Sequence, residues 1–212
     1  MFRFSAFFAL LCVFCPTATA TVVSDFNADL DGWTATGSGS LSHSVAGGNP
    51  DGFAQFDDMP GVLAGDGFLI APAKFLGDWS ALDGVGSLQW DHRILTLGDA
   101  PTIVNASAAI SGPGGQATYF GTLHQTTWTT FSAPISSGDW VIGGGTWNAI
   151  LANVASLTIR IEAVHNDGAA LDVDGIDNVG LVPEPGTLTL LVLGALLVAS
   201  PVVHRRWRTA AS

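Results

Sequence analysis

The sequence is poor in cysteine and in positive charge. It has 2 cysteines in 212 residues, and 7 lysines and arginines against 18 acidic residues. An acidic surface repels phosphate groups, so a nucleic acid partner is excluded. Only 12% of the residues are charged and 48% are hydrophobic. This composition excludes a disordered acidic polymer, because disorder requires low hydrophobicity and a high density of charge.

The few basic residues are concentrated at the two ends of the chain. Residues 21–181 contain only Lys74, Arg93 and Arg160 against 17 acids, which gives this segment a net charge of −14. The negative charge therefore belongs to the middle of the chain. Such a segment disfavours anionic partners and leaves divalent cations and neutral ligands open.

The first twenty residues are typical of a secretory signal peptide. One early positive charge precedes an apolar stretch over residues 7–14, and the small residues Ala18 and Ala20 predict cleavage after Ala20. Cys12 and Cys15 lie in the segment that would be removed, so their spacing is neither a zinc motif nor a redox pair in the mature protein. The exported protein would have no disulfide, and its stability must come from a core, with or without a metal.

Near the C-terminus, residues 187–203 form an uncharged hydrophobic segment of the minimum length for a transmembrane helix. The cluster HRRWR follows at residues 204–208, and its positive charge should stay on the cytoplasmic side. These features predict an exported body that is tethered by its C-terminus.

The same tail resembles the bacterial PEP-CTERM sorting signal. Pro183, Glu184 and Pro185 precede the hydrophobic segment, and Arg205 and Arg206 follow it, in the order of that signal over residues 182–208. The resemblance implies a Gram-negative producer whose exosortase cleaves near the motif. The body would then be released or re-anchored outside the inner membrane, at the cell surface or in the extracellular space. Proteins with this signal are associated with exopolysaccharide and biofilm matrix.

The body, residues 21–181, is predicted to be an all-β sandwich or jelly roll. Short β-branched or aromatic segments are separated by Gly, Pro, Asp and Ser, and several of them alternate between apolar and polar residues. The predicted strands are residues 67–71, 86–95, 102–110, 117–123, 127–131, 156–164 and 176–181. One short helix is predicted over residues 146–154, where apolar residues share one stripe.

Several segments of the body resemble the laminin IV type A (laminin B) domain. They are FLIAPAKFLGDW at 68–79, GVGSLQWD at 84–91, GGNP with GF at 47–53, LANV with LTIR at 151–160, and DNV at 177–179. The acidic loop FDDM at 56–59 departs from the family pattern. The resemblance implies a non-catalytic β-jelly roll of the kind shared with carbohydrate-binding modules.

Jelly rolls of this kind often hold a structural Ca²⁺ between the first and last strands. The resemblance implies ligands from Asp25, Asn27, Asn49, Asp51 and Asp177, because clustered carboxylates and carbonyls provide the oxygens that Ca²⁺ needs. A local EF-hand site over residues 27–38 is disfavoured, because the position of the bidentate glutamate holds a serine. The alternative is that the aspartates form turns and solvate the surface.

Six tryptophans lie in the body. Trp128, Trp140 and Trp147 are the candidates for exposed platforms on which sugar rings stack, whereas Trp33 and Trp90 are expected in the core. The alternative is that all of them pack inside the sandwich.

No enzymatic motif accompanies these features. The histidines are isolated and lack H-E-x-x-H spacing, and G-x-S-x-G is absent. We therefore expect a non-catalytic protein with a structural or adhesive role in exopolysaccharide or biofilm matrix. The alternative function is a carbohydrate-binding module that recognises a surface polysaccharide.

Overall fold

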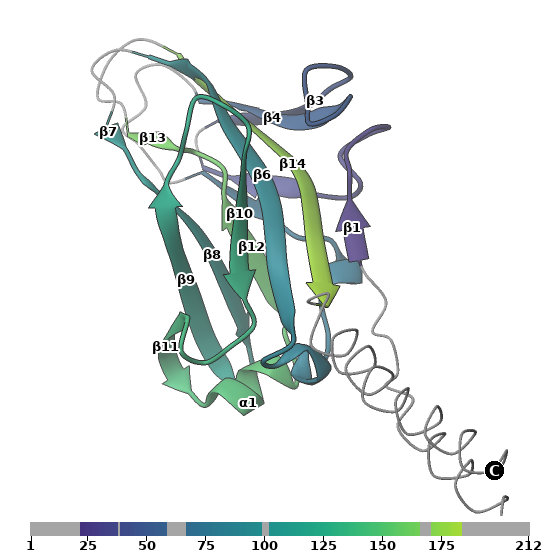
Figure 1. The fold of residues 1–212 in the computed structure, drawn as a ribbon, viewed down its shortest axis with the longest axis vertical. Helices are drawn as coiled ribbons and strands as arrows, with labels where there is room; N and C mark the ends of the chain where they lie inside the picture. Colours follow the sequence, from purple (N-terminus) through teal and green to yellow (C-terminus); the bar gives the residue numbers. More distant parts are fainter. Residues whose placement is uncertain (1–21, 38, 59–66, 99–101, 166–170, 184–212) are drawn as a thin grey trace, which may run out of the picture.

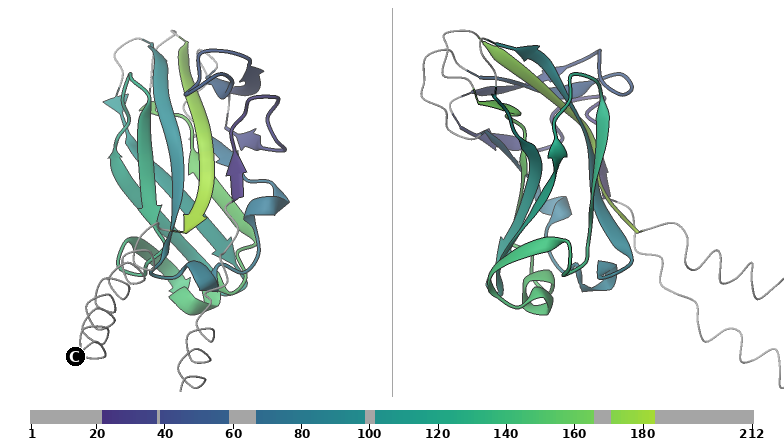
Figure 2. Two further views of the ribbon diagram at one scale, coloured as in Figure 1. Left: turned by 45° about the vertical axis from the view of Figure 1, so that its right-hand side comes forward. Right: turned by 60° about the vertical axis from the view of Figure 1, so that its left-hand side comes forward.

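The computed structural model describes residues 22–37, 39–58, 67–98, 102–165 and 171–183, which fold into two facing antiparallel sheets (Figures 1 and 2). Sheet A has the strand order β10-β6-β14-β4-β3, and a sixth strand, β1, also pairs with β14. Its strands are β10 (Thr129–Pro134), β6 (Gly86–Leu97), β14 (Asp172–Pro183), β4 (Phe53–Asp57), β3 (Ser40–Ser44) and β1 (Val22–Ser24).

Sheet B has the strand order β11-β9-β8-β12-β5-β2. Its strands are β11 (Trp140–Gly145), β9 (Gly115–Leu123), β8 (Asn105–Gly112), β12 (Ser156–Arg160), β5 (Phe68–Ile70) and β2 (Thr34–Thr36). A small pair, β7 (Thr102–Ile103) with β13 (Val164–His165), completes the strands. The helical segments are η1 (Ala73–Phe75), η2 (Ser80–Leu82) and α1 (Trp147–Leu151), and the Thr146 hydroxyl caps α1 by accepting from the Ala149 N–H.

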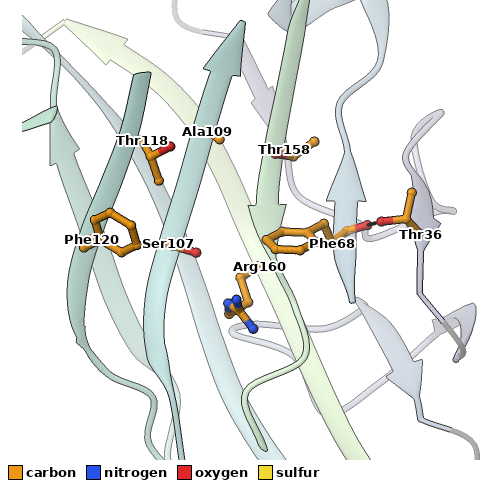
Figure 3. A pocket seen from close by; sticks show the side chains of 8 residues that line it. All are labelled: Thr36, Phe68, Ser107, Ala109, Thr118, Phe120, Thr158 and Arg160. Atoms are coloured by element: carbon orange, nitrogen blue, oxygen red, sulfur yellow. Dashed lines mark hydrogen bonds between the residues drawn. The ribbon is translucent and has the colours of Figure 1, made fainter. Parts of the chain in front are cut away.

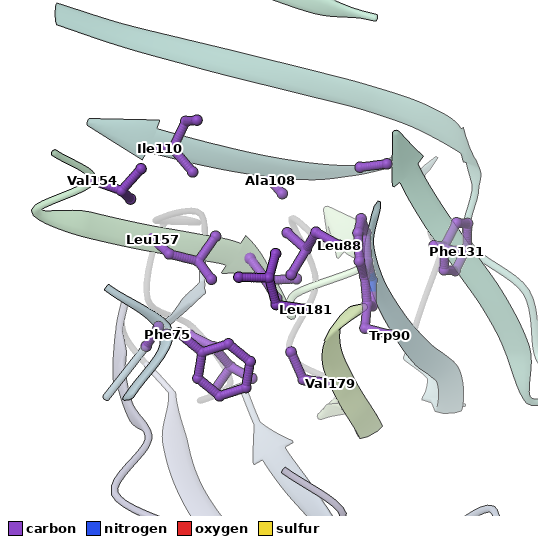
Figure 4. Packing of buried hydrophobic residues seen from close by; sticks show 14 of the residues in the cluster. Phe75, Leu88, Trp90, Ala108, Ile110, Phe131, Val154, Leu157, Val179 and Leu181 are labelled. Carbon is purple, nitrogen blue, oxygen red and sulfur yellow. The ribbon is translucent and has the colours of Figure 1, made fainter. Parts of the chain in front are cut away.

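The core lies between the sheets because alternate residues of each strand point inward (Figure 4). In β12, Leu157 and Ile159 are fully buried, whereas Thr158 and Arg160 face outward. Trp90 of β6 is also fully buried and stacks on Phe131 of β10, with ring centroids 5.6 Å apart. Burial of large apolar side chains of this kind is the main source of stability in a fold without disulfides.

The predicted β-sandwich is confirmed, with differences in detail. The segment predicted as one strand over residues 102–110 divides into β7 and β8, and the predicted strand over 156–164 ends at Arg160 and resumes in β13. Strands β1, β2, β3, β4 and β11 were not predicted. Of these, β2, β3 and β11 are rich in threonine, serine or glycine, and they pair because a neighbouring strand offers backbone partners.

The predicted signal peptide and sorting tail lie almost wholly outside the described residues, so Ala18, Ala20, Glu184, Pro185, Arg205 and Arg206 have no structural account here. Pro183 is the last residue of β14 and pairs with Gly86. Within the described ranges, no helix has both the length and the apolar character that crossing a bilayer requires.

Candidate functional site

The outer face of sheet B carries an open pocket with a volume of about 290 Å³ (Figure 3). It extends across five strands, from β9 through β8, β12 and β5 to β2. Its lining consists of Thr36, Phe68, Ser107, Ala109, Thr118, Phe120, Thr158 and Arg160. We call this surface the sheet B groove.

The strand register places these side chains in two rows across the sheet. Phe120 pairs with Ser107, and Phe68 pairs with both Arg160 and Thr36, which forms the first row. Thr118, Ala109 and Thr158 form the second. Paired residues of neighbouring strands point to the same face, so the alternation that buries the core residues also delivers these side chains to the groove.

Two phenylalanines stand at opposite sides of the groove (Figure 3). Phe120 is 60% exposed, which is unusual for so large an apolar side chain. The guanidinium carbon of Arg160 lies 5.0 Å from the centre of the Phe68 ring, a cation–π contact. Three strand spacings separate β9 from β5, so the backbones that carry the two phenylalanines lie about 14 Å apart, and one extended ligand can contact both rings.

Between the rings the groove offers hydroxyl groups, small side chains and the Arg160 guanidinium (Figure 3). None of its lining residues is an aspartate, glutamate, asparagine or glutamine. A surface with aromatic faces and hydroxyls can bind a ring that is apolar on one face and polar at its edge. The groove is therefore chemically suited to sugars.

The structure corrects the prediction for two of the three tryptophans. Trp140 and Trp147 are only 5% and 6% exposed, and their rings pack against each other with centroids 6.0 Å apart. Their indole N–H groups donate to the Pro134 carbonyl at 2.8 Å and to the Asp83 carboxylate at 2.9 Å. Both belong to the core, because a sandwich end closed by α1 needs large side chains to fill it.

Trp128 is half-buried on the other side of the molecule. Its ring packs edge-on against Phe53, with centroids 5.5 Å apart, and its indole N–H donates to the Gly47 carbonyl at 3.0 Å. These contacts hold the loop of residues 45–51 against the outer face of sheet A. The predicted role of Trp128 in ligand binding stays a prediction, and its observed contacts serve packing.

The predicted calcium residues meet beside the same loop. The Asp177 carboxylate accepts the Asn49 N–H at 2.6 Å and the Asn178 N–H at 2.7 Å. Asp91, which the sequence analysis did not select, accepts the side-chain amides of Asn49 at 3.1 Å and Asn178 at 2.9 Å, and the Thr130 hydroxyl at 2.5 Å. We call these hydrogen bonds the loop clasp.

The other predicted ligands also form local hydrogen bonds. Asp25 accepts the Asn27 N–H at 3.2 Å, the Asn27 side chain accepts the Gly52 N–H at 3.4 Å, and the Asp51 carbonyl accepts the Gly48 N–H at 2.8 Å. Burial raises the pKa of Asp177 to about 6, and the negative charges of Asp91 and Asp25 add to the rise.

A cation between Asp25 and Asp177 would relieve that repulsion, which is the feature of this site that fits Ca²⁺. Over the described ranges, however, no three Asp, Glu, His or Cys side chains are grouped to hold a metal. Calcium binding therefore stays a prediction.

A cluster of buried titratable groups lies inside the sandwich. The Nδ1 atoms of His92 and His124 are 2.9 Å apart, so one nitrogen donates and the other accepts. Burial lowers the pKa of His92 to about 4 and that of His124 to about 2. Asp174 accepts the Ala163 N–H at 2.9 Å, and burial raises its pKa well above the usual value.

The groove could not be predicted from the sequence, because its residues are individually ordinary. Threonines and phenylalanines are common in strands, and their meeting depends on pairings between strands that are distant in the sequence. One signal was available: in the predicted strand over residues 117–123, Phe120 occupies the polar side of the alternation.

Comparisons with solved structures show which folds are similar. An exo-β-agarase matches with a TM-score of 0.54 and 16% identity over 76% of this chain, which spans about a quarter (25%) of that chain. A family 30 carbohydrate-binding module matches with a TM-score of 0.52 and 14% identity, over 79% of this chain and 89% of that one. The family 11 carbohydrate-binding module of the cellulase Lic26A-Cel5E of Clostridium thermocellum matches at 0.50 and 15%, over 79% and 96%.

The L4b domain of human laminin α-2 also matches, with 9% identity over 61% of this chain and 79% of that domain, but its TM-score of 0.44 is too low to carry an argument. No protein-family model matches the sequence, and no curated protein matches it. The laminin IV type A and PEP-CTERM assignments therefore stay predictions. At these low identities the comparisons establish one thing: the body has the β-sandwich fold of known carbohydrate-binding modules.

Proposed function

We propose that this protein is an exported, non-catalytic polysaccharide-binding protein and that the sheet B groove is its binding site. The observation that carries the proposal is the pair of phenylalanines, Phe68 and Phe120, on an open face lined by hydroxyls. Carbohydrate-binding modules among the similar folds support it. The negative charge of the body favours a neutral polysaccharide over an acidic one.

Binding to neutral polysaccharides, measured by affinity electrophoresis, tests this function. We expect Phe120→Ala to weaken binding about tenfold, because removal of an exposed aromatic anchor removes much of the contact energy. Val85→Ser is the matched control, since Val85 is also exposed and lies outside the groove. Equal binding by wild type and Phe120→Ala, or no binding to any polysaccharide, would contradict the proposal.

We further propose that binding serves a structural or adhesive role in exopolysaccharide or biofilm matrix. The support is the sequence of the tail, with Pro183, Glu184 and Pro185 before the hydrophobic segment. Exosortase would be the processing partner, and the inner membrane would hold the protein before processing. Deletion of residues 183–185 should abolish retention at the surface, measured by cell fractionation, whereas Phe120→Ala should leave export unchanged.

A further inference from the structure

Three large apolar side chains stand exposed along one side of the sheet B groove. Phe120 and Leu123 of β9 are 60% and 49% exposed, and Val141 of β11 is 64% exposed. Val141 pairs with Thr118, and Leu123 pairs with Asn105, which shares a face with Ser107. Since paired residues point to the same face, all three belong to the face that carries the groove. We call them the apolar strip.

The apolar strip adds aliphatic surface that an unsubstituted sugar has no apolar group to contact. An unsubstituted hexose is apolar only on the ring face that stacks on an aromatic side chain. Its edge carries hydroxyls, which proteins bind with side chains that donate and accept hydrogen bonds in fixed directions. Apart from its hydroxyls and the Arg160 guanidinium, the groove lining has no hydrogen-bonding side chain, and its threonines and Ala109 add further methyl groups. A valine and a leucine gain free energy only from contact with another apolar group.

The charge of the body further restricts the class of ligand that the groove can bind. Residues 21–181 carry a net charge of −14, so a polyanionic ligand would be repelled over the whole approach. Neither the strip nor its pairing partners Thr118 and Asn105 carry a charge, and Arg160, the charged residue of the groove lining, lies against the Phe68 ring. The surface therefore fits a ligand that is neutral and carries small apolar groups.

We propose that the groove binds a neutral polysaccharide bearing methyl groups, as O-acetyl esters or as 6-deoxy sugars, and that the apolar strip contacts those methyl groups. This inference rests on the proposed function, because it names the class of ligand for the same groove. O-acetyl esters and 6-deoxy sugars both present the group that the strip would contact, a methyl group.

The first experiment compares one neutral polymer in two forms. The full-length protein is titrated with O-acetylated glucomannan and with the same glucomannan after alkaline deacetylation. Deacetylation should weaken binding about fourfold for each methyl group in contact. Val141→Ser and Leu123→Ser should remove this difference, and Val85→Ser should preserve it.

A second arm separates the two sources of the methyl group. Oligosaccharides that differ only in fucose against galactose present the 6-deoxy methyl without an ester. A fucose preference that Val141→Ser abolishes, with no effect of deacetylation on glucomannan, assigns the strip to deoxy sugars. A deacetylation effect without a fucose preference assigns it to acetyl esters. Either result supports the proposal.

Other outcomes would overturn it. If wild type binds methyl-bearing and methyl-free polymers equally, the inference fails while the proposed function stands. If no polysaccharide binds at all, both fail. If Val141→Ser dissociates a dimer in sedimentation analysis and changes no preference between polymers, the strip is covered by a second copy of the chain.

Discussion

The outer faces of the two sheets differ in this molecule: a loop covers the outer face of sheet A, whereas that of sheet B is open. Over sheet A, the loop of residues 45–51 is held down by Trp128 and by the loop clasp around Asp91 and Asp177. Over sheet B, the groove stays open and exposes Phe120. On the outer face of sheet A, which we call the closed face, the acids and aromatic rings make contacts within the protein. We call the outer face of sheet B the open face. The open face keeps its aromatic rings accessible, which is why we place the binding function there.

A large loss of stability is expected from breaking the closed face at Asp91. Asp91→Ala removes the acceptor of three side-chain donors, those of Asn49, Thr130 and Asn178. Asp91 is buried, and hydrogen bonds to a charged acceptor contribute more than neutral ones, so loss of the three should lower the free energy of unfolding by about 2–4 kcal/mol. Urea denaturation measures this. Asp139→Ala, at an exposed turn, is the control and should change stability by less than about 0.5 kcal/mol.

The second effect is a loss of stability in acid caused by the buried histidines. The pKa of His92 is about 4 in the folded protein and that of His124 about 2, whereas the model-peptide value is 6.5. The unfolded chain therefore binds more protons, and the histidine contribution to stability falls as pH drops from 6.5 towards 4. For His92 alone the loss is about 3 kcal/mol.

The raised pKa of Asp174 has the opposite effect on the pH dependence of stability, because burial disfavours its ionised form. The histidine contribution is therefore isolated by comparing wild type with a histidine variant. His124→Gln should lose stability less steeply than wild type between pH 6.5 and 4 in urea denaturation. Parallel profiles for the two proteins would contradict the assignment.

A smaller effect is expected from calcium at the closed face. If Asp25 and Asp177 share a Ca²⁺, the ion at ten times its dissociation constant raises stability by about 1.4 kcal/mol. Thermal melting with Ca²⁺ and with chelator measures the shift, and Asp25→Asn should reduce it. An unchanged melting temperature in wild type would mean that these residues only form turns and the loop clasp.

The smallest effect is expected on the open face. Phe120→Ala and Val141→Ser should each change the free energy of unfolding by less than about 0.5 kcal/mol, because both side chains are already largely in water. The effect of Phe120→Ala on polysaccharide binding, about tenfold, should be larger. A strong loss of stability in urea denaturation would instead make these residues part of the fold.

Particular residues show why the sequence predicted the fold better than the site. In the predicted strand over residues 156–164, alternation places Leu157 and Ile159 on one face, and the structure buries both; alternation is a local property of the chain. Trp140 and Trp147 were misassigned, because a tryptophan in a Gly-rich segment has the same local pattern whether it fills a core or faces water. The pairing of Phe68 with Arg160 joins residues 92 positions apart, and no local pattern contains it.

The sequence by itself determined the class of protein: an acidic body with few charges and an alternating β pattern, between a predicted leader and a predicted sorting tail. These properties follow from composition and from neighbours along the chain. The tertiary structure alone decided which aromatic side chains are open to a ligand and which acids are held in the loop clasp. Exposure and hydrogen bonding depend on which strands pair and which loop covers a face, and burying the core between the two sheets settles both.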